Sequence, residues 1–331
     1  MALDGLADET PLLALMAGYH LGQSDHLGSE TSEKQRQSVQ GKRIRPMLAL
    51  QCCAAAGGDP ATAAPLAAAI ELLHNFTLIH DDIQDRSPNR RHRATVWRIW
   101  GDAQAINAGD ALFAAAQRTL LRTSTDTVPA TTLLRLADEF NRMTIEIVRG
   151  QVLDLAFETE SSVTPDAYLD MIRAKTGAIV RFAAWAGAIV GGASDELAGQ
   201  FAEFGDMLGI GFQIQDDLLG IWGAMSDTGK DPADDIRRHK KSLPVLMLIE
   251  SATPEETAML KEVDGRETVS GEDVERVLAA MDAHNIRAQV TERVREAHRR
   301  AESALANIGH AAGEVDSNLT ALIRRLDARI S

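Results

Sequence analysis

The densest charge pattern in the chain is the stretch HDDIQDRSPNRRHR, residues 80–93, where three aspartates precede a group of arginines. The apolar residues before it predict a helix, which places Asp81 and Asp85 one turn apart on one face, with Asp82 beside them. Three carboxylates this close repel one another unless cations join them, and oxygen ligands of this kind suit Mg²⁺. The stretch therefore predicts a Mg²⁺ site. The alternative is a helix end exposed to solvent.

A second acidic pair lies in GIGFQIQDDLLGIWG, residues 209–223. Asp216 and Asp217 interrupt an otherwise apolar helix, and Gln213 lies about one turn earlier, on the same face. Carboxylates flanked by so many apolar residues are partly buried, and buried charges require a partner or a metal. The pair indicates a second metal or substrate site. A structural salt bridge is the alternative for this cluster taken alone.

Basic residues are grouped into separate islands, each at a loop or a helix end. In a chain of net charge −14, such islands indicate an anionic ligand. Phosphate explains both signs, because it accepts hydrogen bonds from Arg and Lys directly and binds carboxylates through Mg²⁺. Neither a P-loop nor a Rossmann glycine motif occurs in the sequence, which disfavours nucleotide-binding folds. Any one island by itself fits a solvated surface. The islands are Lys42, Arg43 and Arg45; Arg90, Arg91 and Arg93; Lys230; and Arg237, Arg238, Lys240 and Lys241.

The elements that must position these groups are helices. Apolar residues recur at spacings of three and four, while alternating β-branched strands are almost absent, so the chain is predicted to be all-α. Residues 265–331 are predicted to form amphipathic helices, and Thr253 with Glu256 predicts a helix start. No linker marks a boundary, so we expect a single domain over 1–331. The predicted helices cover 47–56, 63–80, 103–122, 130–150, 168–191, 196–222 and 243–250.

The bulk composition excludes several classes of protein. A net charge of −14 makes nucleic acid or an anionic membrane surface a poor partner. Cys52 and Cys53 are adjacent and cannot readily form a disulfide, which fits a reducing cytoplasm. We identify no signal peptide at the start of the sequence, and no apolar run reaches the ~18–20 residues of a membrane span. The sequence predicts a cytoplasmic protein without a membrane span.

Taken in order, the motifs of residues 40–250 resemble those of the trans-isoprenyl diphosphate synthases, or polyprenyl synthetases, and are closest in pattern to geranylgeranyl diphosphate synthases. They are GKRIRP, LLHNFTLIHDDIQD, NRR, RAKTGA, GFQIQDDLLG, TGK and HKKSLP. The resemblance implies ten or more α-helices around a deep central cavity, in a protein that is usually a homodimer. It also implies a trans-prenyltransferase that condenses isopentenyl diphosphate head-to-tail with an allylic diphosphate.

The resemblance also implies roles for individual residues. Up to three Mg²⁺ ions on the allylic diphosphate would be held by Asp81, Asp82, Asp85 and Asp216. The same substrate would contact Arg90, Lys175, Gln213, Lys230 and Lys240. Isopentenyl diphosphate would be held by Lys42, Arg45, His74 and Arg91. Thr176 would lie near the reacting carbons.

The sequence departs from the family pattern in the second acidic motif. The family usually has DDxxD, whereas this chain has Gly220 at the last position. Glycine inside a helix costs ~1 kcal/mol relative to alanine, so we expect it to serve close packing or cavity space. The usual Arg-Arg-Gly is here Arg90-Arg91-His92, a smaller departure.

Product length is predicted from the residues that precede the first aspartate. Thr77 is four positions before Asp81 and Phe76 five before. By resemblance, a small residue at the fourth position before Asp81 with phenylalanine at the fifth indicates a C20 product. A C15 product, or one of C25 and above, is left open.

Two other functions share the cavity fold. A terpene cyclase would act on an allylic diphosphate alone, but such enzymes usually lack the GKRIRP site. A non-catalytic partner subunit of another synthase would tend to lose the first aspartate motif, which is intact here. A structural helical protein with fortuitous charges is disfavoured by the ordered set of motifs.

Overall fold

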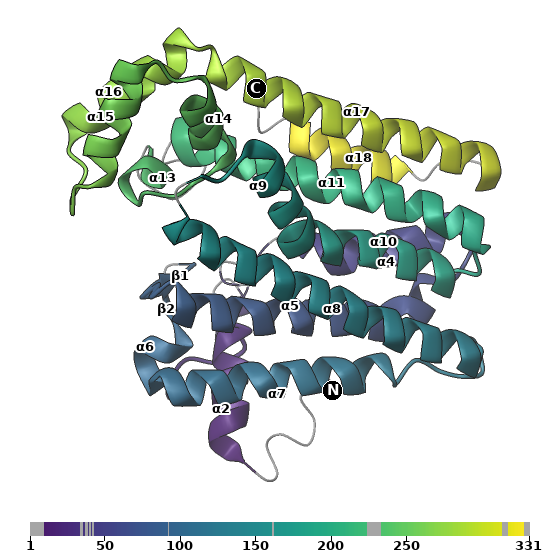
Figure 1. The fold of residues 1–331 in the computed structure, drawn as a ribbon. Helices are drawn as coiled ribbons and strands as arrows, with labels where there is room; N and C mark the ends of the chain where they lie inside the picture. Colours follow the sequence, from purple (N-terminus) through teal and green to yellow (C-terminus); the bar gives the residue numbers. More distant parts are fainter. Residues whose placement is uncertain are drawn as a thin grey trace. The chain divides into compact units, whose positions relative to one another are not determined.

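A computed structural model describes residues 10–33, 36, 39, 41, 43–91, 93–160, 162–223, 233–312 and 317–327. Helices dominate the chain (Figure 1), and the only named strands within those ranges are β1 (Asn89–Arg90) and β2 (Arg93–Ala94), which pair antiparallel. The all-α prediction is confirmed. The chain divides into two compact units, unit 1 (Met1–Glu139 and Ala186–Asp195) and unit 2 (Phe140–Trp185 and Glu196–Ser331). The single domain over 1–331 stays a prediction.

Unit 1 is built around α5 (Ala64–Gln84), which packs along α7 (Asp102–Leu120) and against α4 (Ile44–Ala55). Leu66, Ile70 and Leu73 recur at spacings of four and three on α5 and are fully buried, so one face of the helix enters the core. The C-terminal end of α5 carries the first aspartate motif. Unit 1 also contains α2 (Pro11–His20), η1 (Pro60–Ala63), α6 (Val96–Trp100), the start of α8 (Ala130–Thr159) and the end of α10 (Ala178–Val190).

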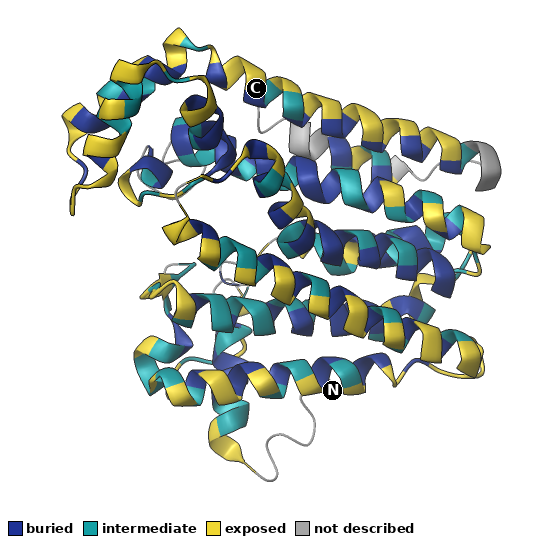
Figure 2. Ribbon diagram, viewed as in Figure 1, coloured by how far each residue is buried: buried dark blue, intermediate teal, exposed yellow. Residues whose placement is uncertain are grey.

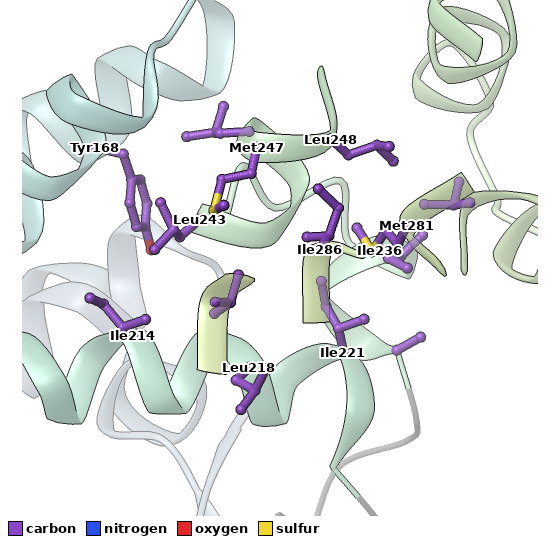
Figure 3. Packing of buried hydrophobic residues seen from close by; sticks show 14 of the residues in the cluster. Tyr168, Ile214, Leu218, Ile221, Ile236, Leu243, Met247, Leu248, Met281 and Ile286 are labelled. Carbon is purple, nitrogen blue, oxygen red and sulfur yellow. The ribbon is translucent and has the colours of Figure 1, made fainter. Parts of the chain in front are cut away.

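Unit 2 has its own apolar core, part of which is shown in Figure 3. α11 (Asp195–Trp222) contributes Ile214, Leu218 and Ile221 to this core, so this helix is anchored on both sides of the second acidic pair. The other elements of unit 2 are the remainder of α8 and α10, α9 (Pro165–Ile172), the π-helical turn η2 (Arg173–Gly177), α13 (Asp234–Arg237), α14 (Leu243–Ser251), α15 (Pro254–Asp264), α16 (Gly271–Ala283), α17 (Ile286–Ala312) and α18 (Ser317–Asp327).

The amphipathic helices predicted beyond residue 265 are confirmed. α17 is buried along one side and exposed along the other (Figure 2), and its Val290 and Val294 belong to the core of unit 2. The predicted start of α15 is also confirmed, because Thr253 and Glu256 form a reciprocal capping box.

The region predicted as one helix over 168–191 differs from the prediction. The structure contains α9 and α10 joined by the π-helical turn η2, which carries Lys175 and Thr176. A single π turn holds one residue more than an α turn, and a pattern of apolar spacing does not distinguish the two. Such turns are frequent at functional sites.

The structure bears on the two cysteines and on the predicted absence of a membrane span. Cys52 and Cys53 are buried free thiols, as expected. Among the described helices, one, Pro60–Gln84, is long and apolar enough by length and composition to cross a membrane, contrary to the sequence estimate. Since 56% of its apolar window is buried inside the structure, it also has the character of a core helix, and the absence of a span stays a prediction.

Candidate active site

The first aspartate motif occupies the C-terminal end of α5. Asp81 is half-buried, Asp82 is 2% exposed, and Asp85 is exposed and serves as the C-cap residue of the helix. The negative end of the helix dipole lies at the same place and adds to the repulsion between the carboxylates. This end of α5 therefore favours cations.

Arg90 supplies one of those cations, because it is paired with Asp82 through two nitrogens. Arg90 Nε lies 3.0 and 2.9 Å from the two oxygens of Asp82, and Nη2 lies 2.8 Å from Oδ1. Burial raises the pKa of Asp82, while the hydrogen bonds and charge of Arg90 oppose that rise. The β1–β2 hairpin thus brings Arg90 back over the aspartate motif.

Arg91 and the Arg45–His74 pair form a second basic group in unit 1. Arg91 has a left-handed backbone (φ 50°), and its Nη1 donates to the carbonyl of Val39 over 2.6 Å. Arg45 Nη1 lies 3.2 Å from His74 Nε2. Because arginine can only donate, Nε2 must accept, so His74 is neutral with its proton on Nδ1. Burial and the charges of Arg45, then Arg91, lower the pKa of His74 well below its usual value.

Helix α2 places Tyr19 and His20 beside Arg91. Both residues line a pocket that also contains Asp82, Arg90 and Arg91. Burial and the charges of Arg90 and Arg91 lower the pKa of His20 to about 3, so it is neutral at physiological pH. The pocket therefore combines one carboxylate with a net excess of positive charge.

The residues predicted to set product length lie one to two turns before the aspartates. Thr77 is half-buried, and its hydroxyl donates to the carbonyl of His74 over 2.8 Å. The Phe76 ring lies 4.7 Å from that of His80 and 5.4 Å from that of Phe113 on α7. These three rings form one aromatic cluster between α5 and α7.

Asp217 is the centre of the arrangement in unit 2. It is 0% exposed, and its oxygens accept from Tyr168 Oη (2.6 Å), Gln213 Nε2 (3.2 Å), Lys240 Nζ (3.5 Å) and the backbone N–H of Leu243 (3.4 Å). A buried carboxylate with four donors is a structural anchor. Its neighbour Asp216 is half-buried on α11.

Lys175 and Thr176 are presented by the π-helical turn η2. Lys175 Nζ lies 2.5 Å from Asp154 Oδ2 on α8. The turn approaches α8 closely because residue 150 is glycine: a Cβ there would lie 2.6 Å from Lys175 Cα. The Thr176 hydroxyl is 3.0 Å from Gln213 Oε1, so Gln213 links Thr176 to Asp217.

The two lysines after α13 differ in their contacts. Lys240 is 46% exposed along its side chain, and its Nζ lies 3.5 Å from Asp217 and 3.7 Å from Asp235. Although burial acts to lower the pKa of Lys240, the charges of Asp217 and then Asp235 raise it well above its usual value. Lys241 Nζ instead donates to the carbonyls of residues 157, 158 and 160, at the C-terminal end of α8. Of the two lysines, only Lys240 has carboxylate partners among the described residues.

The predicted site residues thus fall into two groups, one in each unit. Unit 1 brings together Asp81, Asp82, Asp85, Arg45, His74, Arg90 and Arg91, and unit 2 brings together Lys175, Thr176, Gln213, Asp216 and Lys240. Lys42 and Lys230 lie outside the described residues, as does His92.

Sequence reasoning missed four residues that contact predicted residues or Asp217, the neighbour of Asp216: Asp154, Tyr168, Asp235 and Phe113. Asp154 had a sequence signal, since it interrupts an apolar run of its helix. Tyr168 and Phe113 contact residues that are distant along the chain, which leaves no local pattern. Asp235 lies only five residues before its partner Lys240.

The carboxylates fit a divalent cation that binds together with a diphosphate. Among the described residues, no group of three or more His, Cys, Asp or Glu side chains could hold a metal ion. Mg²⁺ usually takes only one or two protein carboxylates and completes its shell with water and substrate phosphate. Asp81 and Asp85, one turn apart at the negative end of α5, provide that kind of donor set.

Comparisons with known proteins identify the relatives of the chain. The family model Polyprenyl synthetase matches residues 30–281. The (2E,6E)-farnesyl diphosphate synthase of Mycobacterium tuberculosis (H37Rv) is 40% identical over 82% of this chain and 78% of its own length. The geranylgeranyl diphosphate synthase of the same organism is 38% identical over 81% and 74%.

Solved structures give the same result. A polyprenyl synthetase from Streptomyces coelicolor A3(2) superposes with a TM-score of 0.85 and 32% identity, covering 99% of this chain and 94% of its own. A geranylgeranyl pyrophosphate synthetase from Pyrococcus horikoshii has a TM-score of 0.80 and 29% identity, covering 99% and 97%.

Proposed function

We propose that this chain, which belongs to the polyprenyl synthetase family, makes geranylgeranyl diphosphate. Membership makes it a trans-prenyltransferase, and the superposition with family structures confirms the predicted isoprenoid-synthase-type fold. The relatives do not decide the product, because farnesyl and geranylgeranyl synthases match at 40% and 38% identity. The C20 product is supported by Thr77, which is small, together with the larger Phe76 one residue earlier, whose ring packs at a tilt against that of Phe113.

The proposed substrates are isopentenyl diphosphate and an allylic diphosphate. The former would be bound by Arg45, Arg91 and Lys42, with neutral His74 orienting the guanidinium of Arg45. The latter would be bound by Lys175 and Lys240, with Arg90, Gln213 and Lys230 as further contacts.

The reaction requires the allylic C–O bond to break, with the diphosphate leaving as the anion. The double bond of isopentenyl diphosphate then attacks the allylic carbocation, a C–C bond forms, and a proton is lost. Mg²⁺, held by Asp81, Asp82, Asp85 and Asp216, would supply positive charge to the leaving group. Lys175 and Lys240 would stabilise the same growing charge, while Thr176 and Gln213 keep the π-helical turn in place near it. No side-chain base is assigned, and the departing diphosphate would accept the proton.

A homodimer in the cytoplasm is part of the same proposal. Ile145, Val148 and Val152 lie at spacings of three and four on α8 and are 70%, 50% and 60% exposed. An exposed apolar stripe on one helix face supports burial against a second copy. Ile145→Glu combined with Val152→Glu is expected to yield monomers in sedimentation-velocity runs. A dimer unchanged by both charges would refute this choice of surface.

Product analysis tests the proposed activity. Purified protein would be incubated with Mg²⁺, labelled isopentenyl diphosphate and, separately, dimethylallyl, geranyl or farnesyl diphosphate, and the dephosphorylated products sized by mass. A C20 alcohol that disappears in Asp81→Ala would support the proposal, and Phe76→Ala is expected to lengthen the product, since it removes a ring from the cluster.

Other outcomes each contradict a different part of it. A C15 product would correct the length only. A hydrocarbon or cyclic alcohol formed without isopentenyl diphosphate would indicate a cyclase. An absence of turnover would indicate a partner subunit.

A further inference from the structure

Gly220 stands where the family pattern has the third aspartate of its second acidic motif, and the space beside it is occupied. A Cβ added to Gly220 would lie 2.6 Å from Asp235 Cγ and 2.8 Å from its Oδ1. Cβ atoms essentially never make non-bonded contacts this short, so no side chain fits at position 220 while the carboxyl group of Asp235 keeps its place. The carboxyl group of Asp235 fills the volume in which a side chain of residue 220 would begin.

The position of Asp235 is fixed by its own helix. Asp235 is 3% exposed on the short helix α13, and the next residue, Ile236, is buried in the core of unit 2 with Ile221 and Met281 (Figure 3). Ile221 directly follows Gly220 on α11, so α13 is held against the same turn of α11 that lacks a side chain. The approach of Asp235 to Gly220 is therefore set by packing.

The neighbours of Asp235 tie it to the candidate site. Lys240 Nζ lies 3.7 Å from Asp235 Oδ2 and 3.5 Å from Asp217 Oδ1, so one ammonium lies between two buried carboxylates. Asp216 and Gly220 are one turn apart on α11, which places the carboxyl group of Asp235 about one helical turn from Asp216.

We propose that Asp235 supplies, from α13, the carboxylate that position 220 lacks, and that together with Asp217 it positions Lys240 for the diphosphate of the allylic substrate. This inference rests on the proposed function. Gly220 is then a matched partner of Asp235, because it leaves the space that the carboxylate needs. Asp235 is a positioning residue and acts through Lys240.

Binding and turnover would be measured for Asp235→Asn, which keeps the shape and removes the charge. We expect the KM for the allylic diphosphate, and the calorimetric Kd for inorganic diphosphate with Mg²⁺, to rise about tenfold, as for the loss of one of the two carboxylates that form ion pairs with Lys240. The KM for isopentenyl diphosphate should not change. Asp234→Asn, which removes the same charge from the adjacent residue of α13, is the matched control and should leave both constants near those of the wild type.

The sign of the effect separates positioning from simple repulsion. If Asp235 only repelled the diphosphate, its removal would lower KM and Kd, and that result would overturn the proposal. So would unchanged constants. Wild-type turnover in the same experiment reports on the proposed function separately, because it does not depend on either variant.

Exchange of the two residues gives an independent test. Gly220→Asp/Asp235→Gly returns the carboxylate to α11 and leaves the net charge unchanged. The exchange variant should recover most of the diphosphate affinity, or of the folded yield, that Asp235→Gly loses. An exchange variant no better than Asp235→Gly in both respects would refute the pairing of Gly220 with Asp235.

Discussion

Replacing Tyr168 by phenylalanine removes a single hydroxyl group from the centre of unit 2. Tyr168 Oη donates to Asp217 over 2.6 Å, and the two residues are 3% and 0% exposed. The three other donors to Asp217 within the described part of the chain lie 3.2, 3.4 and 3.5 Å away. Tyr168→Phe therefore removes the shortest hydrogen bond to a buried carboxylate, and no water can easily replace it.

The size of the effect follows from the charge of the acceptor. A hydrogen bond to a charged group contributes roughly 1.5–3 kcal/mol, against about 1 kcal/mol for a neutral pair. The only other tyrosine, Tyr19, is 6% exposed and donates to the backbone carbonyl of Ala94 over 2.7 Å, which makes it a matched neutral control. We expect Tyr168→Phe to lower the free energy of unfolding by about twice as much as Tyr19→Phe.

Urea unfolding at pH 7.5, followed by tryptophan fluorescence, measures both losses. Trp97 and Trp100 belong to unit 1 and Trp185 and Trp222 to unit 2, so each unit has its own reporters. Equal losses for the two tyrosine variants would refute the view that Asp217 is a charged anchor. A double-mutant cycle of Tyr168→Phe with Asp217→Asn should show a coupling energy of at least about 1 kcal/mol, because the residues are in direct contact.

Three further predictions concern charge and packing. His20 is neutral in the folded protein, with a pKa of about 3, whereas in the unfolded chain its pKa is about 6.5. The free energy of unfolding should therefore fall by up to ~1.4 kcal/mol for each pH unit below 6.5. His20→Asn should show a shallower dependence of this free energy on pH in urea titrations between pH 6.5 and 5. Lys241→Ala removes the ammonium from three carbonyls at the end of α8 and should cost about 1 kcal/mol of stability in thermal unfolding, with little change in the KM for either substrate. Gly150→Ala forces a methyl group against the backbone of Lys175 and should cost ~1–3 kcal/mol and reduce kcat more than the Lys241 variant does; a wild-type kcat in steady-state assays would contradict the assigned role of the π-helical turn.

The helices could be predicted because the spacing of apolar residues along the sequence determines which face of each helix is apolar. The run that ends at Asp81 buries Leu66, Ile70 and Leu73, and the capping residues of α15 are separated by only three positions. The one-turn spacing of Asp81 and Asp85 likewise follows from the helix itself.

What could not be predicted depends on contacts between distant segments. The π-helical turn η2 lies against Gly150, and nothing in its own five residues distinguishes it from an α-helical turn. Lys240 and Lys241 are adjacent and chemically identical, yet one faces two carboxylates and the other caps α8. The periodicity of apolar residues assigns a residue to a face of its own helix. It does not indicate which residue of another segment that face contacts.

The division of the chain into two units has a consequence for its synthesis. Unit 1 ends with Ala186–Asp195, which the ribosome makes only after Phe140–Trp185 of unit 2. Until then α4 lacks the segment that closes on it, where Gly191 approaches Cys53 so nearly that a Cβ would lie 3.1 Å from its carbonyl carbon. At about 5–20 residues per second, the nascent first unit waits for seconds with that face of α4 uncovered. Since the chain passes between units within α8, α10 and α11, neither unit can be separated from the other by a cut in a loop, and a cut at any of these points would divide a helix.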